Sequence, residues 1–231
     1  MSVITARGAE AKAGAEKERL DTSKIYLRLK DGESHKVRIL STMDYVEYNA
    51  VQDWDNGIYS QPVGEGSPLL KAHKDGGETF KNLFARKRYA FVFASVETGE
   101  LVAFDASKNQ AKNLIGTIEE YAENIEETVF TFKRSGNGTS TVYALNPKLK
   151  MTADEKKVFE TFEGREVENE FFEKILQPND DKFVVKLLAE IDPSIVSLFP
   201  EISLEDEDAA TTVTKVADNG TVDLDDSDLP F

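Results

Sequence analysis

The sequence predicts a mostly β fold with added helices, and three observations support this. Short segments that alternate apolar and polar residues, separated by turn residues, run from 24 to 146. One amphipathic stretch interrupts them at 107–122, and helical spacing takes over at 152–190. From about residue 205 the apolar periodicity is lost, which is typical of a segment that cannot bury a core.

The first strands are predicted from alternation. KIYLRLK at 24–30 alternates apolar and polar residues, and Asp31-Gly32 favours a hairpin turn into HKVRIL. This hairpin would have a basic outer face. Residues 43–54 form a further strand. The Gly/Pro-rich stretch 55–77 is expected to be irregular, because a loop of that length in a compact domain is usually functional or mobile.

The later elements suggest how the sheet is completed. FARKRYAFVFASV is apolar on both faces from Ala90 onward, which indicates a central strand, and Thr98-Gly99 turns the chain into ELVAFDAS. Ser107 is a suitable N-cap for the amphipathic helix, and TVFTFKRSGNGTSTVYAL predicts two strands around a Gly-Asn-Gly turn. Five to seven strands with one helix before the last hairpin favour an oligonucleotide-binding (OB) fold, a five-stranded Greek-key barrel. The pattern alone also fits a sandwich.

The chain is therefore expected to have four parts. Residues 1–22 read as an N-terminal helical arm, and 23–150 as the OB-fold core. Residues 151–203 read as an α-helical C-terminal extension of two or three helices packed on that core. Residues 204–231 read as a disordered acidic tail.

Charge is distributed unevenly along the chain. The net charge of −15 is concentrated towards the C-terminus, where residues 201–231 hold ten acids and one Lys. By contrast, residues 71–90 hold six bases against two acids. Because a local patch rather than the total charge binds a ligand, the acidic total does not exclude nucleic acid.

Several function classes find no support in the sequence. The chain has no Cys and only two His, which excludes disulfides and nearly excludes a conventional zinc site. No phosphate loop, nucleophile elbow or metalloprotease motif is present. No long apolar run or export signal is present either, so we expect a protein of a reducing compartment that neither spans a membrane nor is exported. We expect no catalysis, no cofactor and no metal.

A single-strand binder needs cations for phosphates and aromatic faces for bases. The segment from Lys71 to Tyr89 supplies both kinds of group, aromatic residues lie just upstream, and the basic face of the first hairpin would add more. Phe91 and Phe93 are expected in the core instead. The candidate DNA-binding residues are Tyr26, Arg28, Lys36, Arg38, Tyr48, Trp54, Tyr59, Lys71, Lys74, Phe80, Lys81, Phe84, Arg86, Lys87 and Arg88.

Two rival functions are weighed against this one. The net charge of −15 suggests an acidic protein that mimics DNA and inhibits DNA-binding proteins, but its acids are heavily terminal rather than spread over the fold. Asp53 and Asp55 could hold magnesium in a nuclease, although a turn with flanking acids explains them more simply.

The C-terminus carries a family resemblance. Asp225-Asp226-Ser227-Asp228-Leu229-Pro230-Phe231 resembles the acidic tip of bacterial-type single-stranded DNA-binding proteins, which runs acid-acid-acid-Ile-Pro-Phe. Here Ser227 interrupts the acids and Leu229 replaces Ile. The body is similar to the single-stranded DNA-binding proteins of tailed bacteriophages, in ETGELVAFDASKNQAKNLIGTIEEYA and FTFKRSGNGTSTVYALNP. Some phage relatives carry a zinc site, which a chain without Cys should lack.

The resemblance implies a non-catalytic protein that coats and protects single-stranded DNA in phage replication, recombination and repair, in the host bacterial cytoplasm. It also implies that the tip binds replication or recombination proteins. A portable ligand of this kind would be steered by its acids and anchored by the Phe ring and terminal carboxylate. We expect a monomer or homodimer. The tip residues are Asp225, Asp226, Asp228, Leu229, Pro230 and Phe231.

Overall fold

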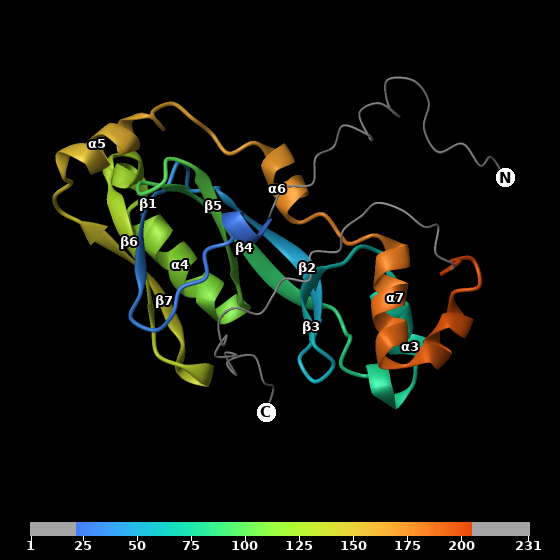
Figure 1. Cartoon of the computed structure of the whole chain (residues 1–231). Coiled ribbons are helices and arrows are strands. Elements are labelled where there is room, and N and C mark those ends of the chain that lie inside the picture. The colour runs from blue at the N-terminus through green and yellow to red at the C-terminus, as the bar shows by residue number, and fades with distance from the viewer. Residues whose placement is uncertain (1–21, 205–231) are drawn as a thin grey trace, which may run out of the picture.

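The computed structural model describes residues 22–204 and contains one antiparallel sheet of seven strands, with helices added around it (Figure 1). The mostly β part of the predicted fold class is therefore confirmed. The strands run in the order β3-β2-β4-β1-β6-β7, and β5 pairs with β4. Their bounds are β1 (Ser34–Arg38), β2 (Tyr45–Asp53), β3 (Ile58–Pro62), β4 (Arg86–Ser95), β5 (Leu101–Ala106), β6 (Val129–Ser135) and β7 (Val142–Lys148).

Strand β4 is central, as the sequence predicted. It pairs with β5 along one edge, while on the other edge it pairs first with β2 and then with β1. Residues 90–96 are all buried, which explains why this segment is apolar on both faces. Within residues 22–204 no ladder joins β5 to β7, so the sheet is open.

The main core lies between the sheet and helix α4 (Lys108–Glu120). Ser107 accepts a hydrogen bond from Gln110 N, and the Gln110 side chain accepts from Ser107 N, so the predicted N-cap is confirmed as a full capping box. Leu114 and Ile118 of α4 pack against Phe residues from the strands. The main core comprises Val37, Ile39, Phe91, Phe93, Val102, Phe104, Ala106, Ala111, Leu114, Ile118, Ile125, Phe130, Phe132 and Leu145.

The predicted strand at 24–30 is wrong. Residues Thr22–Ile25 form a short helical turn, α2, and only Tyr26 makes an isolated bridge, to Ala103 of β5. The following residues run from the edge of β5 to the end of β6, where Arg134 Nη1 donates to Leu29 O at 2.9 Å. Leu27 and Leu29 pack on the main core. The alternation of apolar residues therefore comes from a segment with one buried side, the strap at residues 26–31, and not from a strand that pairs with β1. The Asp31-Gly32 turn is confirmed: Glu33 N donates to Lys30 O at 3.0 Å.

The stretch 55–77, predicted as irregular, contains β3 and helix α3 (Pro68–Asp75). A short 3-10 helix, η1 (Glu78–Phe80), follows. These elements pack with helix α7 (Asp181–Ile191) and the 3-10 helix η4 (Pro193–Leu198) into a side core at one end of the molecule (Figure 1). The side core comprises Val51, Ile58, Val63, Leu69, Ala72, Phe80, Leu83, Val184, Val185, Leu188, Ile195 and Phe199. Contacts distant in sequence decide this region, which is why local composition misjudged it.

The C-terminal helices cover the outer face of the sheet. Helix α5 (Ala153–Glu160) places Phe159 against Val96 and Val129, while helix α6 (Asn169–Ile175) places Phe172 and Ile175 against β4 and β5. Figure 1 shows α5 and α7 at opposite ends of the molecule, with α6 between them.

Two sequence predictions fall outside the part of the chain that the structure describes: nearly all of the N-terminal arm and the acidic tail, including its tip. Among the helices of residues 22–204, none has the length and apolar character that crossing a membrane requires.

Candidate nucleic-acid interface

Two exposed aromatic rings lie at the hairpin between β2 and β3. Trp54 follows the end of β2, Tyr59 lies in β3, and their ring centroids are 5.2 Å apart in an edge-to-face arrangement. Their exposed fractions are 37% and 58%. Because these rings are exposed in the folded protein, a ligand can stack on their π-faces without any change of the fold.

A third exposed ring lies just before β4. Phe84 is 39% exposed, and the Arg86 guanidinium carbon lies 4.2 Å above its ring centroid. His73 of α3 also lies near Phe84, with ring centroids 6.1 Å apart. A ring and a cation are therefore in direct contact at this point of the chain, because Arg86 packs on Phe84.

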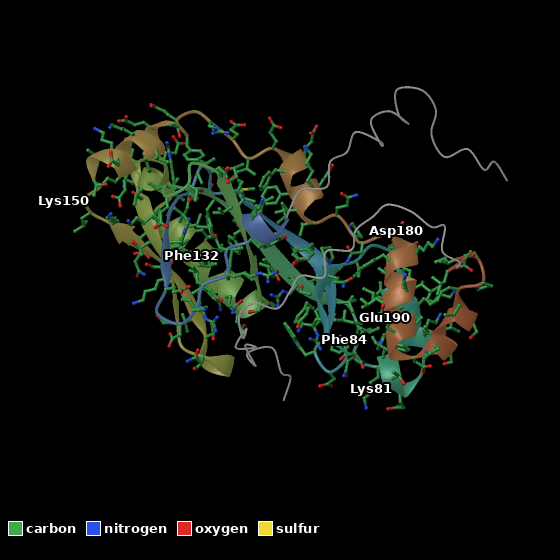
Figure 2. The ribbon with its side chains drawn as sticks, viewed as in Figure 1. Lys81, Phe84, Phe132, Lys150, Asp180 and Glu190 are labelled. Atoms are coloured by element: carbon green, nitrogen blue, oxygen red, sulfur yellow. The ribbon has the colours of Figure 1, made fainter. Side chains whose placement is uncertain are left out.

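Hydrogen bonds tie the two aromatic sites together. Asn56 Nδ2, at the hairpin, donates to Thr79 O at 3.1 Å, in the segment that leads to Phe84. Asn82 Nδ2 donates back to Asp55 Oδ2 at 3.5 Å. Figure 2 shows Phe84 close to this hairpin and well away from Phe132 of the main core. We call Trp54, Tyr59, Phe84 and Arg86 the aromatic platform.

Arg88 is held by an acid of the neighbouring strand. Its Nε and Nη2 donate to the two carboxylate oxygens of Asp105 in β5, at 3.1 and 2.8 Å. The Tyr48 hydroxyl donates to the same carboxylate at 2.8 Å, and burial, followed by the charge of Asp105, raises the pKa of Tyr48. The side chains of Arg88 and Asp105 are only 11% and 20% exposed, so the structure itself neutralises this predicted DNA contact.

Lys87 is also paired across strands. Its Nζ bonds to Glu47 Oε1 of β2, and the Tyr89 hydroxyl donates to Glu47 Oε2 at 2.7 Å. The hydrogen bonds from Lys87 and then Tyr89 lower the pKa of Glu47, which keeps its carboxylate charged.

The lysines before β4 are closer to the surface. Lys71 lies 4.0 Å from Glu201 and 5.0 Å above the Phe199 ring, and Lys81 pairs with Glu78 at 3.2 Å. Exposed pairs of this kind contribute about 0–1 kcal/mol, so they restrain the lysines weakly. Lys74 is exposed on α3, and no ion pair of Lys74 occurs among the described residues.

The predicted outer face of the first hairpin is largely covered. Arg38 is 6% exposed, donates to Phe159 O at 2.7 Å and lies over that ring, while Lys36 pairs with Glu155 of α5 at 2.8 Å. Tyr26 is half-buried and its hydroxyl donates to Ile175 O at 3.4 Å. The C-terminal helices therefore cover the face of β1 that the sequence analysis predicted to bind DNA. Only Arg28 of this group is exposed.

Phe80 is a further correction. Its side chain has no exposed surface and belongs to the side core, so no base can reach its ring in this structure. The sequence placed it among basic residues, but η1 turns it inward while Lys81, next in sequence, stays exposed.

The residues of the rival nuclease do not form a pair. Asp53 is 2% exposed and accepts a hydrogen bond from Asn56, whereas Asp55 is exposed and accepts from Asn82. Within residues 22–204, no group of three or more His, Asp or Glu side chains could hold a metal ion.

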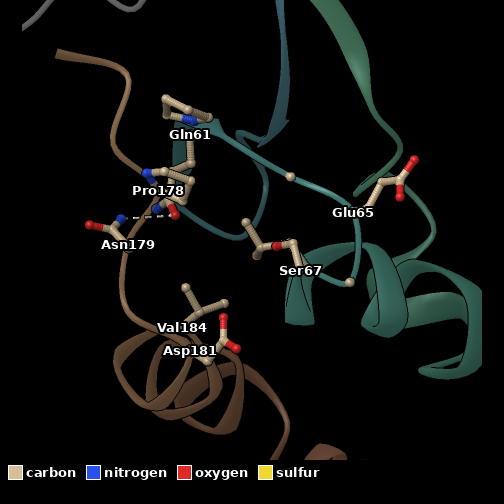
Figure 3. A pocket seen from close by; sticks show the side chains of 11 residues that line it. Gln61, Glu65, Ser67, Pro178, Asn179, Asp181 and Val184 are labelled. Atoms are coloured by element: carbon tan, nitrogen blue, oxygen red, sulfur yellow. Dashed lines mark hydrogen bonds between the residues drawn. The ribbon is translucent and has the colours of Figure 1, made fainter. Parts of the chain in front are cut away.

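A cavity of about 210 Å³ opens between β3, α3 and α7 (Figure 3). Asn179 donates to Gln61 Oε1 at 3.1 Å on its wall, and Glu65 and Asp181 also line it. With two acids and no base among its lining residues, this cavity does not suit a phosphate.

Sequence reasoning missed Glu47 and Asp105, the two acids that neutralise Lys87 and Arg88 of β4. Glu47 lies 40 residues from Lys87 along the chain, and Asp105 lies 17 residues from Arg88. Only the strand register brings each pair together, and the sequence carries no local signal of that register.

Comparisons with models of known protein families and with curated proteins found no match to this chain.

Proposed function

We propose that this protein binds single-stranded DNA without sequence preference, by stacking bases on the aromatic platform. The observation that carries this proposal is the convergence of Trp54, Tyr59 and the Phe84–Arg86 pair on one hydrogen-bonded part of the surface. Stacking on such rings is worth about 1–3 kcal/mol per base and accepts any base, since every base has a π-face.

The strand connections support an OB-fold as the finer fold assignment. Strands β1 and β2 pair with successive parts of one edge of β4, as a single bent strand would. If β1 and β2 are counted as one strand, and β3 as part of the loop that follows it, the core has five strands, and α4 lies between the third and the fourth. The strap at residues 26–31 bridges the gap between β5 and β6. In OB-folds, the loop after the first strand contributes to nucleic-acid binding, and here it carries the platform.

The wider biological role belongs to the same proposal. In it the protein coats single strands during phage DNA replication, recombination and repair in the host cytoplasm, and its tip recruits partner proteins. This part is supported only by the resemblance of the C-terminal residues and of the body segments quoted above, since the tip lies outside the described residues.

Trp54 provides a direct test, because it is the only Trp in the chain. Titration with oligo-dT should quench its fluorescence, since a base stacked on the indole replaces its present surroundings. Phe84→Ala should weaken binding about 5- to 150-fold, the equivalent of one lost stacking contact. Phe183→Ala is the matched control: Phe183 is 50% exposed but lies on α7, outside the platform.

Equal losses for the two Phe variants would remove the platform from the proposal. If the protein binds no oligo-dT at low salt, the acidic DNA mimic becomes the better candidate. It is favoured by one observation: residues 22–204 alone hold 30 acidic and 23 basic residues, a net charge of −7.

A further inference from the structure

We propose that Glu47 and Asp105 determine the ligand class of this site: by neutralising Lys87 and Arg88, they make it recognise the faces of unpaired bases rather than phosphates. This inference rests on the proposed function and specifies how a single strand is distinguished from a duplex. The discriminating residues are acids in a site that sequence alone describes as basic.

The strand register places one acid against each of these two cations of β4. Because side chains alternate along a strand, Arg86 and Arg88 share one face of β4 and Lys87 lies on the other. Asp105 reaches Arg88 from β5, on one side of β4, while Glu47 reaches Lys87 from β2, on the other side. One cation on each face of the strand is therefore neutralised next to the platform.

Each acid accepts hydrogen bonds from two side chains. Asp105 receives donors from two strands, Arg88 of β4 and Tyr48 of β2, and its side chain is only 20% exposed. The Glu47 carboxylate accepts hydrogen bonds from both Lys87 and Tyr89. A phosphate that approached either cation would also approach a fixed carboxylate, so repulsion from that carboxylate would offset the attraction.

This arrangement selects against duplex DNA. A duplex presents its phosphates outward and keeps its base faces stacked inside, so only a surface with net positive charge holds it without sequence contacts. A single strand can turn its bases onto Trp54, Tyr59 and Phe84 instead. A single strand can therefore bind by stacking its bases on the platform. A duplex would have to bind through its phosphates, and Lys87 and Arg88 provide little net positive charge for them.

The salt dependence of binding measures this directly. For single strands the slope of log K against log salt is about −0.7 for each phosphate neutralised. Six cations between residues 71 and 90 would give about −4 if all contacted phosphates. Two of the six, Lys87 and Arg88, are paired with Glu47 and Asp105, whereas the exposed pairs of Lys71 and Lys81 restrain those lysines only weakly. We therefore expect a slope no steeper than about −3.

The decisive variant is Glu47→Gln in the full chain, since the Glu47 side chain is 41% exposed and its loss should not prevent folding. Anisotropy titrations with oligo-dT, with a duplex of equal length as competitor, should show severalfold tighter binding at low salt. The salt slope should steepen by about 0.7, and competition by duplex should increase. Glu160→Gln is the matched control: it makes the same charge change on α5, where Glu160 pairs with Lys156 at 3.7 Å.

A second readout uses a neutral-backbone oligomer, a thymine peptide nucleic acid. The wild-type protein should still bind it, with an affinity lower than that for oligo-dT by the loss of no more than about four phosphate contacts. A wild-type slope near −4, or identical behaviour of the Glu47 and Glu160 variants, would overturn the inference while leaving DNA binding intact. Absence of binding to every oligomer would instead remove the proposed function itself.

Discussion

At the scale of single residues, Glu155 shows how one acid decides what its neighbours can do. It accepts hydrogen bonds from Lys148 at 2.7 Å and from Thr152 N at 2.8 Å, and pairs with Lys36 at 2.8 Å. The hydrogen bonds from Lys148, Lys36 and Thr152 lower the pKa of Glu155 from about 4.5 to about 2. Lys36, a predicted DNA contact, therefore serves to hold α5 on the sheet.

This predicts an acid-dependent loss of stability. A carboxyl group whose pKa is lower in the folded state stabilises the fold fully above its unfolded value, near pH 4.5, and progressively less as pH falls towards 2. Glu155→Gln should therefore lower the free energy of unfolding at pH 7, and should flatten its decline between pH 4.5 and pH 2. Urea unfolding followed by circular dichroism across this range measures both effects.

The control for this prediction is again Glu160→Gln, one helical turn and a residue further along the same helix. Its pair with Lys156 is exposed, and such pairs contribute about 0–1 kcal/mol. If both variants changed stability equally at pH 7, the donors around Glu155 would have no special role.

At the scale of elements, the sequence predicted a helix or hairpin correctly where its capping residues, turn and pairing partner are close along the chain. The helix at 107–122 was predicted from Ser107 and its apolar spacing, and the hairpin at 129–148 from the Gly-rich turn; both are present. The prediction of a strand at 24–30 was wrong because alternating apolar residues indicate that one side of a segment is buried, but do not show whether it pairs with another strand. The stretch 55–77 was misjudged because its Gly and Pro residues suggested a loop, whereas α3 has its own apolar spacing, Leu69 and Ala72, and packs on α7, more than 100 residues away.

The end of α3 gives a prediction at this scale. A Cβ added at Gly76 would lie 2.5 Å from Ala72 O, 2.7 Å from Phe80 Cδ2 and 2.8 Å from Ile195 Cδ1. Gly76→Ala should therefore lower the free energy of unfolding by about 1–3 kcal/mol, because the side core is already filled. Thermal and urea unfolding measure this loss.

Gly116 of α4 is the matched position. It lies inside a helix, is exposed, and a Cβ added there meets nothing within 4 Å. Gly116→Ala should raise the free energy of unfolding by roughly 0.5–1 kcal/mol, since Ala loses less backbone entropy in a helix. A stable Gly76 variant would mean that α3 packs less closely on η4 than the geometry here requires.

At the scale of the whole molecule, charge is divided between the described body and the acidic tail. Residues 205–231 hold nine acids and one Lys. A tail of this charge, tethered to a body that we propose binds DNA, is present at high effective concentration and should compete with DNA for cationic groups. We expect deletion of residues 205–231 to tighten oligo-dT binding, most strongly at low salt, where screening is weakest. Anisotropy titrations at several salt concentrations test this, and equal affinities with and without the tail would contradict it.

The sequence by itself determined the mostly β class, the central strand, the helix at 107–122 and the presence of helices after residue 151. These follow from periodicity and capping, which act between residues close along the chain. It also identified Trp54, Tyr59, Phe84 and Arg86, which the structure leaves on the surface together.

Only the tertiary structure decided which cations remain available. Arg38 is covered by α5, and Lys87 and Arg88 face Glu47 and Asp105. Composition counts bases along a segment, but the net charge of a surface depends on acids that strand register brings beside them. Register is set by contacts between residues distant in sequence. For that reason the sequence predicted the aromatic residues of this site, but not which of its cations are neutralised by acids.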